Sequence, residues 1–175
     1  HILNSIDRSL KRLRTDYIDL YQVHSPDPFT PIEETLRILD DLVRSGKVRY
    51  VGCSNFAAWQ LADSLAVSEK AGLARFETAQ VYYSLAGRDI ENEIVPLCEY
   101  KKVGILTWSP LAGGYLSGKY RKGIKGRRTA SLDGGFPPVD TAHGDKVLDL
   151  LAEIAKKRGI GEAAVALAWL CARPY

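Results

Sequence analysis

The chain has 175 residues, of which 46% are hydrophobic and 26% charged, and its formal net charge is +3. This composition is typical of a folded globular domain and excludes a disordered chain, while the charge is too small to indicate nucleic-acid binding. No apolar run approaches the roughly 20 residues of a membrane span, and the first residues lack the layout of a signal peptide. We therefore expect neither a membrane nor a nucleic acid among its partners.

The cysteines indicate a reducing compartment. Cys53, Cys98 and Cys171 are an odd number, are widely spaced, and lie within apolar runs. This pattern is typical of reduced core residues, so we expect a cytoplasmic protein. No group of His, Cys or carboxylate residues has the spacing of metal ligands, and we expect no metal site.

The first predicted element is an amphipathic helix over residues 2–14. Ile2, Ile6, Leu10 and Leu13 recur at helical spacing from the start of the chain, and the sequence contains no Met. A chain that opens in the middle of such a pattern is typical of a segment from a longer protein. We therefore expect further residues upstream.

The predicted elements then alternate between strand and helix. The strands, each short and apolar, are predicted at 17–23, 48–53, 76–82 and 103–108. A helix is expected to begin with Thr30 as its N-cap and Pro31 in its first position, and to stop at Gly46. Further helices are predicted at about 57–71, stopped by Gly72, and at about 91–102, disturbed by Pro96. Strands that recur roughly every 30 residues with helices between them predict a parallel sheet covered by helices.

The pattern changes after residue 108. A long loop is predicted at about 109–144, followed by helices at 145–158 and about 162–172. The last helix is apolar on nearly every side, which predicts that it is buried. Trp59 and Trp169 lie within apolar helical patterns and are expected in the core. The whole chain, 1–175, is predicted to be a single domain.

Polar or aromatic residues stand at the C-terminal end of every predicted strand. They are His24, then Ser54 and Asn55, then Gln80, then Trp108 and Ser109. In a barrel of βα units these ends converge on one mouth, where binding and catalytic sites are built. A lone histidine at a strand end usually only hydrogen-bonds a neighbour. The recurrence at four strand ends favours a functional His24.

The same residues suit a flat ligand that carries an amide and a phosphate. Ser54, Asn55 and Gln80 offer hydroxyl and carboxamide groups to a planar amide, and Trp108 offers a face for stacking. Gly113, Gly114 and Gly118 permit close approach of the backbone to a phosphate, and Lys119 supplies a positive charge. By itself this glycine-rich segment could equally be a surface loop. The six cations in residues 119–128 indicate either a solvated loop or a strap for an anionic cofactor.

Four segments resemble signatures of a known family. "RTDYIDLYQVHSPD", "GKVRYVGCSNF", "ETAQVYYSL" and "GILTWSPLAGGYLSGKY" are similar, in order and interval, to segments of the aldo-keto reductases. Those proteins are NADP(H)-dependent carbonyl reductases built on a (β/α)8 TIM barrel. The resemblance is to the branch with a long loop after strand seven, which includes bacterial general reductases and potassium-channel β subunits. It implies an α/β fold, here a partial barrel of about four βα units plus C-terminal helices.

The resemblance also implies roles for individual residues. His24 matches the histidine of the family's catalytic Asp-Tyr-Lys-His tetrad, which orients and polarises the substrate carbonyl. Ser54, Asn55 and Gln80 would hold the nicotinamide carboxamide of NADP(H), and Trp108 would stack on the ring. Tyr83 is similar to a residue beside the pocket. The loop expected to wrap the pyrophosphate contains Ser109, Pro110, Leu111, Gly113, Leu116, Gly118 and Lys119. The implied partner is a small carbonyl substrate.

The chain departs from the family pattern at both ends. The tetrad's Asp, Tyr and Lys and the family's eighth strand have no counterpart in these residues, so the tyrosine that serves as general acid is not among them. A partial barrel would have open edges through which self-association is expected. The leading hypothesis is therefore a carbonyl reductase of which this is a part. The alternatives are a non-catalytic cofactor-binding or regulatory module, and a remnant without function.

Overall fold

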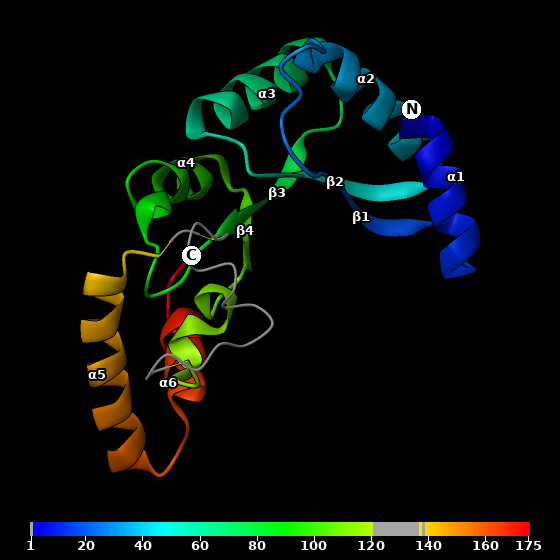
Figure 1. Cartoon of the computed structure of the whole chain (residues 1–175). Helices are drawn as coiled ribbons and strands as arrows, with labels where there is room; N and C mark the ends of the chain where they lie inside the picture. Colours follow the sequence, from blue (N-terminus) through cyan, green and yellow to red (C-terminus); the bar gives the residue numbers. More distant parts are fainter. Residues whose placement is uncertain (1, 121–136, 138) are drawn as a thin grey trace. The chain divides into compact units, whose positions relative to one another are not determined.

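The structure is a computed structural model that describes residues 2–120, 137 and 139–175 (Figure 1). Its four strands are β1 (Ile18–Val23), β2 (Val48–Ser54), β3 (Phe76–Tyr82) and β4 (Gly104–Trp108). They form one sheet in the order β1-β2-β3-β4, and β2 runs parallel to both β1 and β3. Every predicted strand is confirmed, with bounds that differ by at most one residue. Sequential parallel strands with helices between them are the βα units of a partial barrel, as predicted.

Helices precede, separate and follow the strands. The α-helices are α1 (Ile2–Leu13), α2 (Ile32–Arg44), α3 (Ala58–Ala71), α4 (Ile94–Lys101), α5 (Thr141–Arg158) and α6 (Glu162–Cys171). Two short 3-10 helices, η1 (Asp89–Glu91) and η2 (Ala112–Ser117), lie between them. Within the described residues, no helix combines the length and the apolar character that a membrane crossing requires.

Helix α2 ends as predicted but begins differently. Gly46 has φ +74, the left-handed conformation expected of a glycine that follows a helix, and Gly72 does the same after α3 with φ +64. Thr30, however, does not cap α2: its hydroxyl donates to the carboxylate of Asp27 over 2.7 Å, and Pro31 is the N-cap residue. The predicted cap is wrong by one residue, because the Asp27 turn engages the Thr30 hydroxyl first.

Two other helix starts differ from the prediction. Helix α4 begins at Ile94, about three residues after the predicted start. Pro96 lies inside α4, in its first turn, where a missing backbone N–H removes no hydrogen bond within the helix. Helix α5 begins at Thr141, four residues before the predicted start. The carboxylate of Asp140 accepts hydrogen bonds from the backbone N–H groups of Ala142 and His143, so Asp140 acts as the N-cap.

The chain divides into two compact units. The first contains His1–Val81 and Glu93–Leu106, and the second contains Tyr82–Asn92 and Thr107–Tyr175. The prediction of a single domain stays a prediction. In the first unit α2 packs on α3 and on the sheet. The buried side chains of this unit include Leu36, Leu39, Val51, Leu61 and Phe76.

The core of the second unit forms between η2, α5 and α6. Its buried residues are Ala112, Tyr115, Leu116, Leu148, Leu151 and Ala166. The hydroxyl of Tyr115 donates to the carboxylate of Asp145, which ties η2 to α5. Gly144 permits this contact, because a Cβ there would lie 2.6 Å from the Tyr115 ring.

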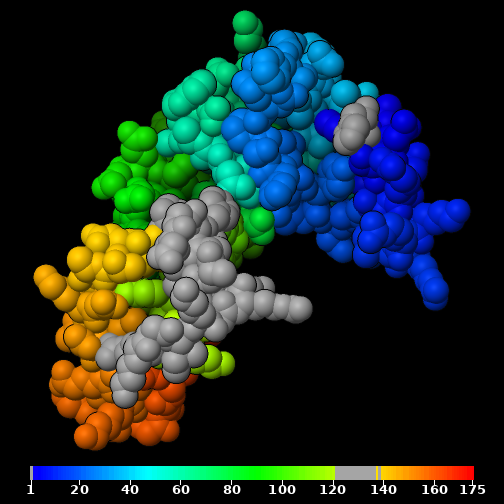
Figure 2. Space-filling view, viewed as in Figure 1, coloured from blue at the N-terminus to red at the C-terminus, as the bar shows by residue number. Residues whose placement is uncertain are grey.

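Three burial predictions are wrong. Trp59 is 71% exposed, Cys171 is exposed, and Ala166 is the one fully buried residue of α6 among those described. In the view of Figure 2 many atoms of α5, yellow to orange, lie at the surface. An apolar sequence buries only the face that another element covers, and among the described elements α6 makes extensive contacts with η2 and α5 alone. Cys53 and Cys98 are buried, as predicted, and all three cysteines are free thiols.

Candidate functional site

The polar residues predicted in the first unit lie together at the C-terminal ends of neighbouring strands. Ser54 pairs with Gln80, and Val23, the residue before His24, pairs with Cys53. The strand ends are therefore in register. His24, Ser54 and Gln80 stand at the same level on three neighbouring strands.

Asn55 connects two of these strand ends. Its side-chain Nδ2 donates to the backbone oxygen of His24 over 2.9 Å and to the Ser54 hydroxyl over 3.1 Å. Its backbone N–H donates to the backbone oxygen of Gln80 over 3.0 Å. Asn55 thus joins the end of β2 to the ends of both neighbouring strands. The structure brings the four predicted residues of this unit together.

The backbone of Asn55 explains why this bridge forms locally. Its φ is +60, in the left-handed region that asparagine tolerates better than other residues with a Cβ. This conformation turns the chain sharply after β2, directly before Phe56. The sequence predicted Asn55 as a polar group but not as a turn residue.

Cys53 lies beside this cluster without belonging to it. The side chain is fully buried, and burial raises the pKa of its thiol to about 12. A thiol with so high a pKa carries almost no thiolate near neutral pH, so it is a poor nucleophile.

The remaining predicted residues belong to the second unit. The Trp108 ring lies 5.1 Å from the Tyr82 ring, with a tilt of 34° between their planes. Trp108 is half-buried, so part of the indole remains accessible. A half-buried indole supported on one side by another aromatic ring is suited to stacking on the other.

The segment after Trp108 is a chain of left-handed turns. Positive φ values occur at Ser109 (+50), Ala112 (+50), Gly113 (+66), Gly114 (+101) and Gly118 (+71). Successive tight turns of this kind produce a compact loop, to which η2 belongs. Glycine suits the last three of these positions because residues with a Cβ disfavour such conformations.

Several N–H groups of this loop are already engaged inside it. The backbone of Ala112 donates to Ser109, that of Gly114 and Leu116 to Leu111, and that of Gly118 to Tyr115, at 2.7 to 3.3 Å. These bonds order the loop rather than face a ligand. A phosphate would therefore be held by other groups, among which Lys119 is the predicted cation.

A carboxylate stands beside the same loop. A Cβ on Gly118 would lie 3.2 Å from Oε1 of Glu162, the first residue of α6. This negative charge close to Gly118 was not predicted from the sequence. It weighs against an anion directly at Gly118 and favours one nearer Lys119.

Tyr83 anchors a hydrogen-bond network in the second unit. It is 1% exposed, and its hydroxyl donates to the Glu91 carboxylate and lies 2.9 Å from the Tyr175 hydroxyl. Arg88 binds the same carboxylate through two nitrogens, at 2.8 and 2.9 Å. The Arg88 hydrogen bond, followed by that of Tyr83, lowers the pKa of Glu91.

The network was not foreseen from the sequence, although a signal was present. Arg88 and Glu91 are three residues apart, the spacing of a pair on one helical turn. Burial, together with the hydrogen bond to Glu91, raises the pKa of Tyr83. Tyr83 is therefore a neutral hydrogen-bond donor held in a fixed position, and the prediction that it lies beside a ligand pocket stays a prediction.

Two further predictions concern the basic run after Gly118 and the absence of a metal site. Residues 121–128 of the basic run lie outside the described residues. Among the residues that are described, no group of three or more His, Cys, Asp and Glu is arranged to hold a metal ion.

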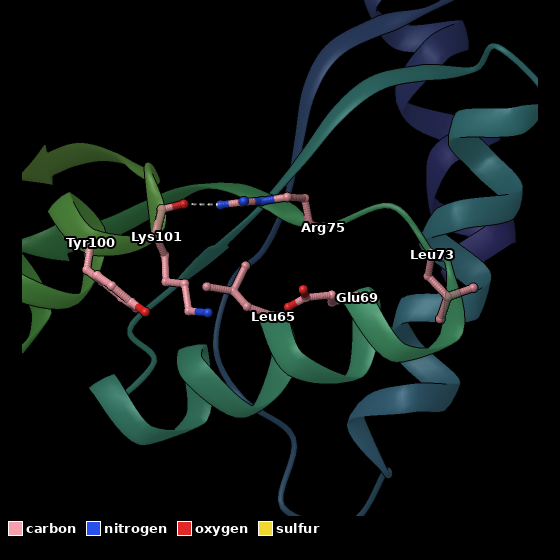
Figure 3. A pocket seen from close by; sticks show the side chains of 6 residues that line it. All are labelled: Leu65, Glu69, Leu73, Arg75, Tyr100 and Lys101. Carbon is pink, nitrogen blue, oxygen red and sulfur yellow. Dashed lines mark hydrogen bonds between the residues drawn. The ribbon is translucent and has the colours of Figure 1, made fainter.

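A pocket of about 550 Å³ in the first unit contains none of the predicted residues. Figure 3 shows its lining residues, which are Leu65, Glu69, Leu73, Arg75, Tyr100 and Lys101. Arg75 directly precedes β3, so this pocket is at the opposite end of the strand from Gln80. The Arg75 guanidinium donates to the Lys101 backbone oxygen over 2.8 Å, and the Lys101 ammonium lies 5.3 Å from the centre of the Tyr100 ring. Its cations are thus engaged in contacts within the protein.

Comparison with known proteins identifies relatives of the whole chain. The sequence pattern of the aldo/keto reductase family matches residues 1–175. The chain is 41% identical to the uncharacterized oxidoreductase YrpG of Bacillus subtilis, over 99% of the chain and 52% of that protein. It is 36% identical to the versiconal hemiacetal acetate reductase of Aspergillus parasiticus, over 99% of the chain and 51% of that protein. It is 37% identical to the aldo-keto reductase dtxS3 of Metarhizium robertsii, over 97% of the chain and 46% of that protein. The chain spans about half the length of these curated relatives.

Proposed function

The chain belongs to the aldo/keto reductase family, and from this premise we propose that the protein containing it reduces aldehydes or ketones to alcohols with NADP(H). In this proposal His24 is the catalytic residue of the chain. Ser54, Asn55 and Gln80 bind the nicotinamide end of the cofactor. Trp108 stacks on the nicotinamide ring, and the loop from Ser109 to Lys119 binds the pyrophosphate.

The observation that carries the proposal is the in-register cluster at the ends of β1, β2 and β3. His24, Ser54 and Gln80 stand at the ends of adjacent strands. Asn55 joins these ends by hydrogen bonds at 2.9 to 3.1 Å to the backbone oxygens of His24 and Gln80 and to the Ser54 hydroxyl. The C-terminal strand ends are where barrel enzymes bind their substrates and cofactors. An arrangement with both donors and acceptors is what a carboxamide and a carbonyl require.

The chemistry of these side chains fits a nicotinamide cofactor, which when bound would supply the hydride. A carboxamide both donates and accepts, and the Ser54 hydroxyl and the Gln80 amide can do the same toward it. The turn at Asn55 holds Ser54 and Gln80 in place without help from a ligand. The role of His24 is to donate a hydrogen bond to the carbonyl oxygen of the substrate and so to polarise the carbonyl.

The loop of the second unit supports binding of the anionic part of the cofactor. The left-handed turns at Gly113, Gly114 and Gly118 give it a compact path, and Lys119 follows directly with a positive charge. The Glu162 carboxylate near Gly118 limits the strength of this binding. We propose that Lys119 neutralises the phosphate charge while the hydroxyl of Ser109 donates a hydrogen bond.

The test is a cofactor and carbonyl assay on the protein at its natural length. We expect oxidation of NADPH, followed by its absorbance, that depends on an added aromatic aldehyde, with NADH consumed more slowly. Replacement Gln80→Ala should raise the KM for NADPH, whereas Glu69→Gln, in the pocket at the other end of the sheet, should leave it unchanged. Binding of NADPH without consumption would instead favour a regulatory module. Absence of both binding and consumption would refute the proposal.

A further inference from the structure

A second pocket of the first unit lies beside the C-terminal end of β1, apart from the residues proposed to act on the carbonyl. Its volume is about 270 Å³, and its lining comes entirely from residues 23–64. Val23 lines it, but His24, Ser54, Asn55 and Gln80 do not. The reductase function proposed above gives no role to this pocket.

Six of the twelve residues that line this pocket are apolar, and the other six are Asp27, Thr30, Thr35, Gln60, Asp63 and Ser64. Pro26 and Pro28 come from the loop after β1, Ile32 from the first turn of α2, and Phe56 from the segment after β2. Phe56 is 6% exposed and packs edge-on against Phe76, with ring centres 5.6 Å apart. Proline rings and a locked phenylalanine give a preformed surface, which loses little entropy when a ligand binds.

One side of the pocket carries an indole and a carboxylate from the same helix. Trp59 and Asp63 are four residues apart in α3 and therefore lie on one face, a turn apart. Both line the pocket, and the Trp59 side chain is 71% exposed. The indole face is the aromatic surface that attracts a cation most strongly.

A second carboxylate lines the pocket from the loop after β1. Asp27 accepts hydrogen bonds from the Phe29 backbone N–H over 2.9 Å and from the Thr30 hydroxyl over 2.7 Å. These bonds, that of the Phe29 backbone first, lower the pKa of Asp27, so it is negatively charged near neutral pH. None of the pocket's lining residues, all of them among those described, carries a positive charge. The pocket therefore combines two carboxylates, an indole and apolar walls.

We propose that this pocket binds a small organic ammonium ion, most favourably one whose nitrogen is methylated. The head group would contact the Trp59 indole between the carboxylates of Asp27 and Asp63, and its methyl groups would pack on Pro26 and Pro28. An ammonium whose nitrogen is fully methylated has no N–H group to satisfy and is weakly hydrated, so the apolar part of the lining does not penalise it. A metal ion would instead require several oxygens in its first shell, and the described residues contain no group of three or more His, Cys, Asp and Glu arranged to hold one.

The volume limits the size of the ligand. Drug-sized ligands occupy pockets of roughly 300–1,000 Å³, and this pocket is slightly smaller. An ammonium with a short substituent, such as choline, is of suitable size. Choline is used below as the probe of this chemistry.

The proposal is tested by fluorine NMR on the protein at its natural length, labelled with 5-fluorotryptophan. Loss of one signal in Trp59→Leu assigns the Trp59 resonance. Choline chloride, titrated at constant ionic strength, should shift this resonance saturably in the millimolar range. The neutral isostere 3,3-dimethylbutan-1-ol should bind about tenfold more weakly, because it lacks the charge.

Two matched variants then test whether choline binding depends on a carboxylate of this pocket or on the charge of the protein in general. Asp63→Asn should weaken choline binding by about threefold or more, whereas Glu99→Gln, an exposed carboxylate of α4, should leave it unchanged. Equal thermal midpoints for both variants would show that each is folded. The proposal is overturned if choline leaves the Trp59 resonance unmoved, if the neutral isostere binds as well as choline, or if Glu99→Gln weakens binding as much as Asp63→Asn. None of these outcomes depends on reductase activity.

Discussion

The side-chain amide of Asn55 donates a hydrogen bond to the backbone oxygen of His24 over 2.9 Å. This bond fixes the backbone at the end of β1 relative to the end of β2. Asn55 forms it from a left-handed conformation, φ +60, that few residues with a Cβ adopt readily. The position thus requires both a short amide side chain and tolerance of positive φ, and asparagine combines the two.

Replacement of Asn55 should separate these two requirements. Asn55→Gly removes the amide but keeps the backbone unstrained, while Asn55→Ala removes the amide and adds strain of about 1 kcal/mol. We expect both variants to lose turnover, because the His24 backbone is no longer held. Urea unfolding should show Asn55→Ala to be less stable than Asn55→Gly by about 1 kcal/mol. Wild-type turnover in either variant would contradict the role given to this bond.

Gly52 allows β2 and β3 to approach closely. A Cβ at Gly52 would lie 2.2 Å from Oγ1 of Thr78 and 3.0 Å from its backbone oxygen. Gly52→Ala should therefore lower the free energy of unfolding by about 1–3 kcal/mol, since the backbone oxygen cannot move aside. Gly104→Ala in β4 is the control, because its Cβ would meet only ordinary contacts at 3.6 Å. Comparable loss in the two variants, measured by urea unfolding, would refute this explanation.

The three thiols should differ sharply in reactivity. Burial raises the pKa of Cys53 to about 12 and that of Cys98 to about 11, and both side chains are enclosed. Iodoacetamide at about pH 8 should label exposed Cys171 in the folded protein and leave the other two unmodified. Mass spectrometry of peptides would measure this, and labelling of all three in urea is the control. Rapid modification of Cys53 in the native state would contradict its enclosed position.

The Glu91 network should make stability depend on pH. Hydrogen bonds from Arg88 and Tyr83 lower the pKa of Glu91. The ionised carboxylate therefore stabilises the fold at pH values above the ordinary pKa of a glutamate. That contribution is lost as the pH falls through the lowered value. Glu91→Gln should therefore cost about 1–2 kcal/mol near pH 7, and the difference from wild type should shrink toward about pH 3. An unchanged difference across this range would rule out ionisation of Glu91 as the cause.

Strand positions and helix stops could be predicted because they depend on local residues. The apolar runs of β1 to β4 and the glycines at 46 and 72 specify their conformations without distant contacts. Helix starts were less accurate, since the capping group is decided by competition among nearby side chains. The Thr30 hydroxyl is engaged by Asp27, and Asp140 begins α5 earlier than the apolar pattern indicated.

Burial and contacts between elements could not be predicted to the same extent. Trp59 has the apolar surroundings of a core residue in sequence, yet its side chain is 71% exposed. The residues at the strand ends were predicted as a group, but the bond from Asn55 to His24 depends on the register of β1 and β2. The network of Arg88, Glu91 and Tyr83 likewise requires the fold to bring its members together.

The most direct test of the proposed function is the turnover of a His24→Ala variant of the protein at its natural length. Carbonyl-dependent oxidation of NADPH should fall by about 100-fold or more, the range for loss of a group that acts on the reacting carbonyl. His143→Ala is the matched control, because this exposed histidine lies in α5, and its turnover should equal that of wild type. Wild-type turnover in a folded His24→Ala protein would contradict the assignment of the strand-end cluster as the catalytic site.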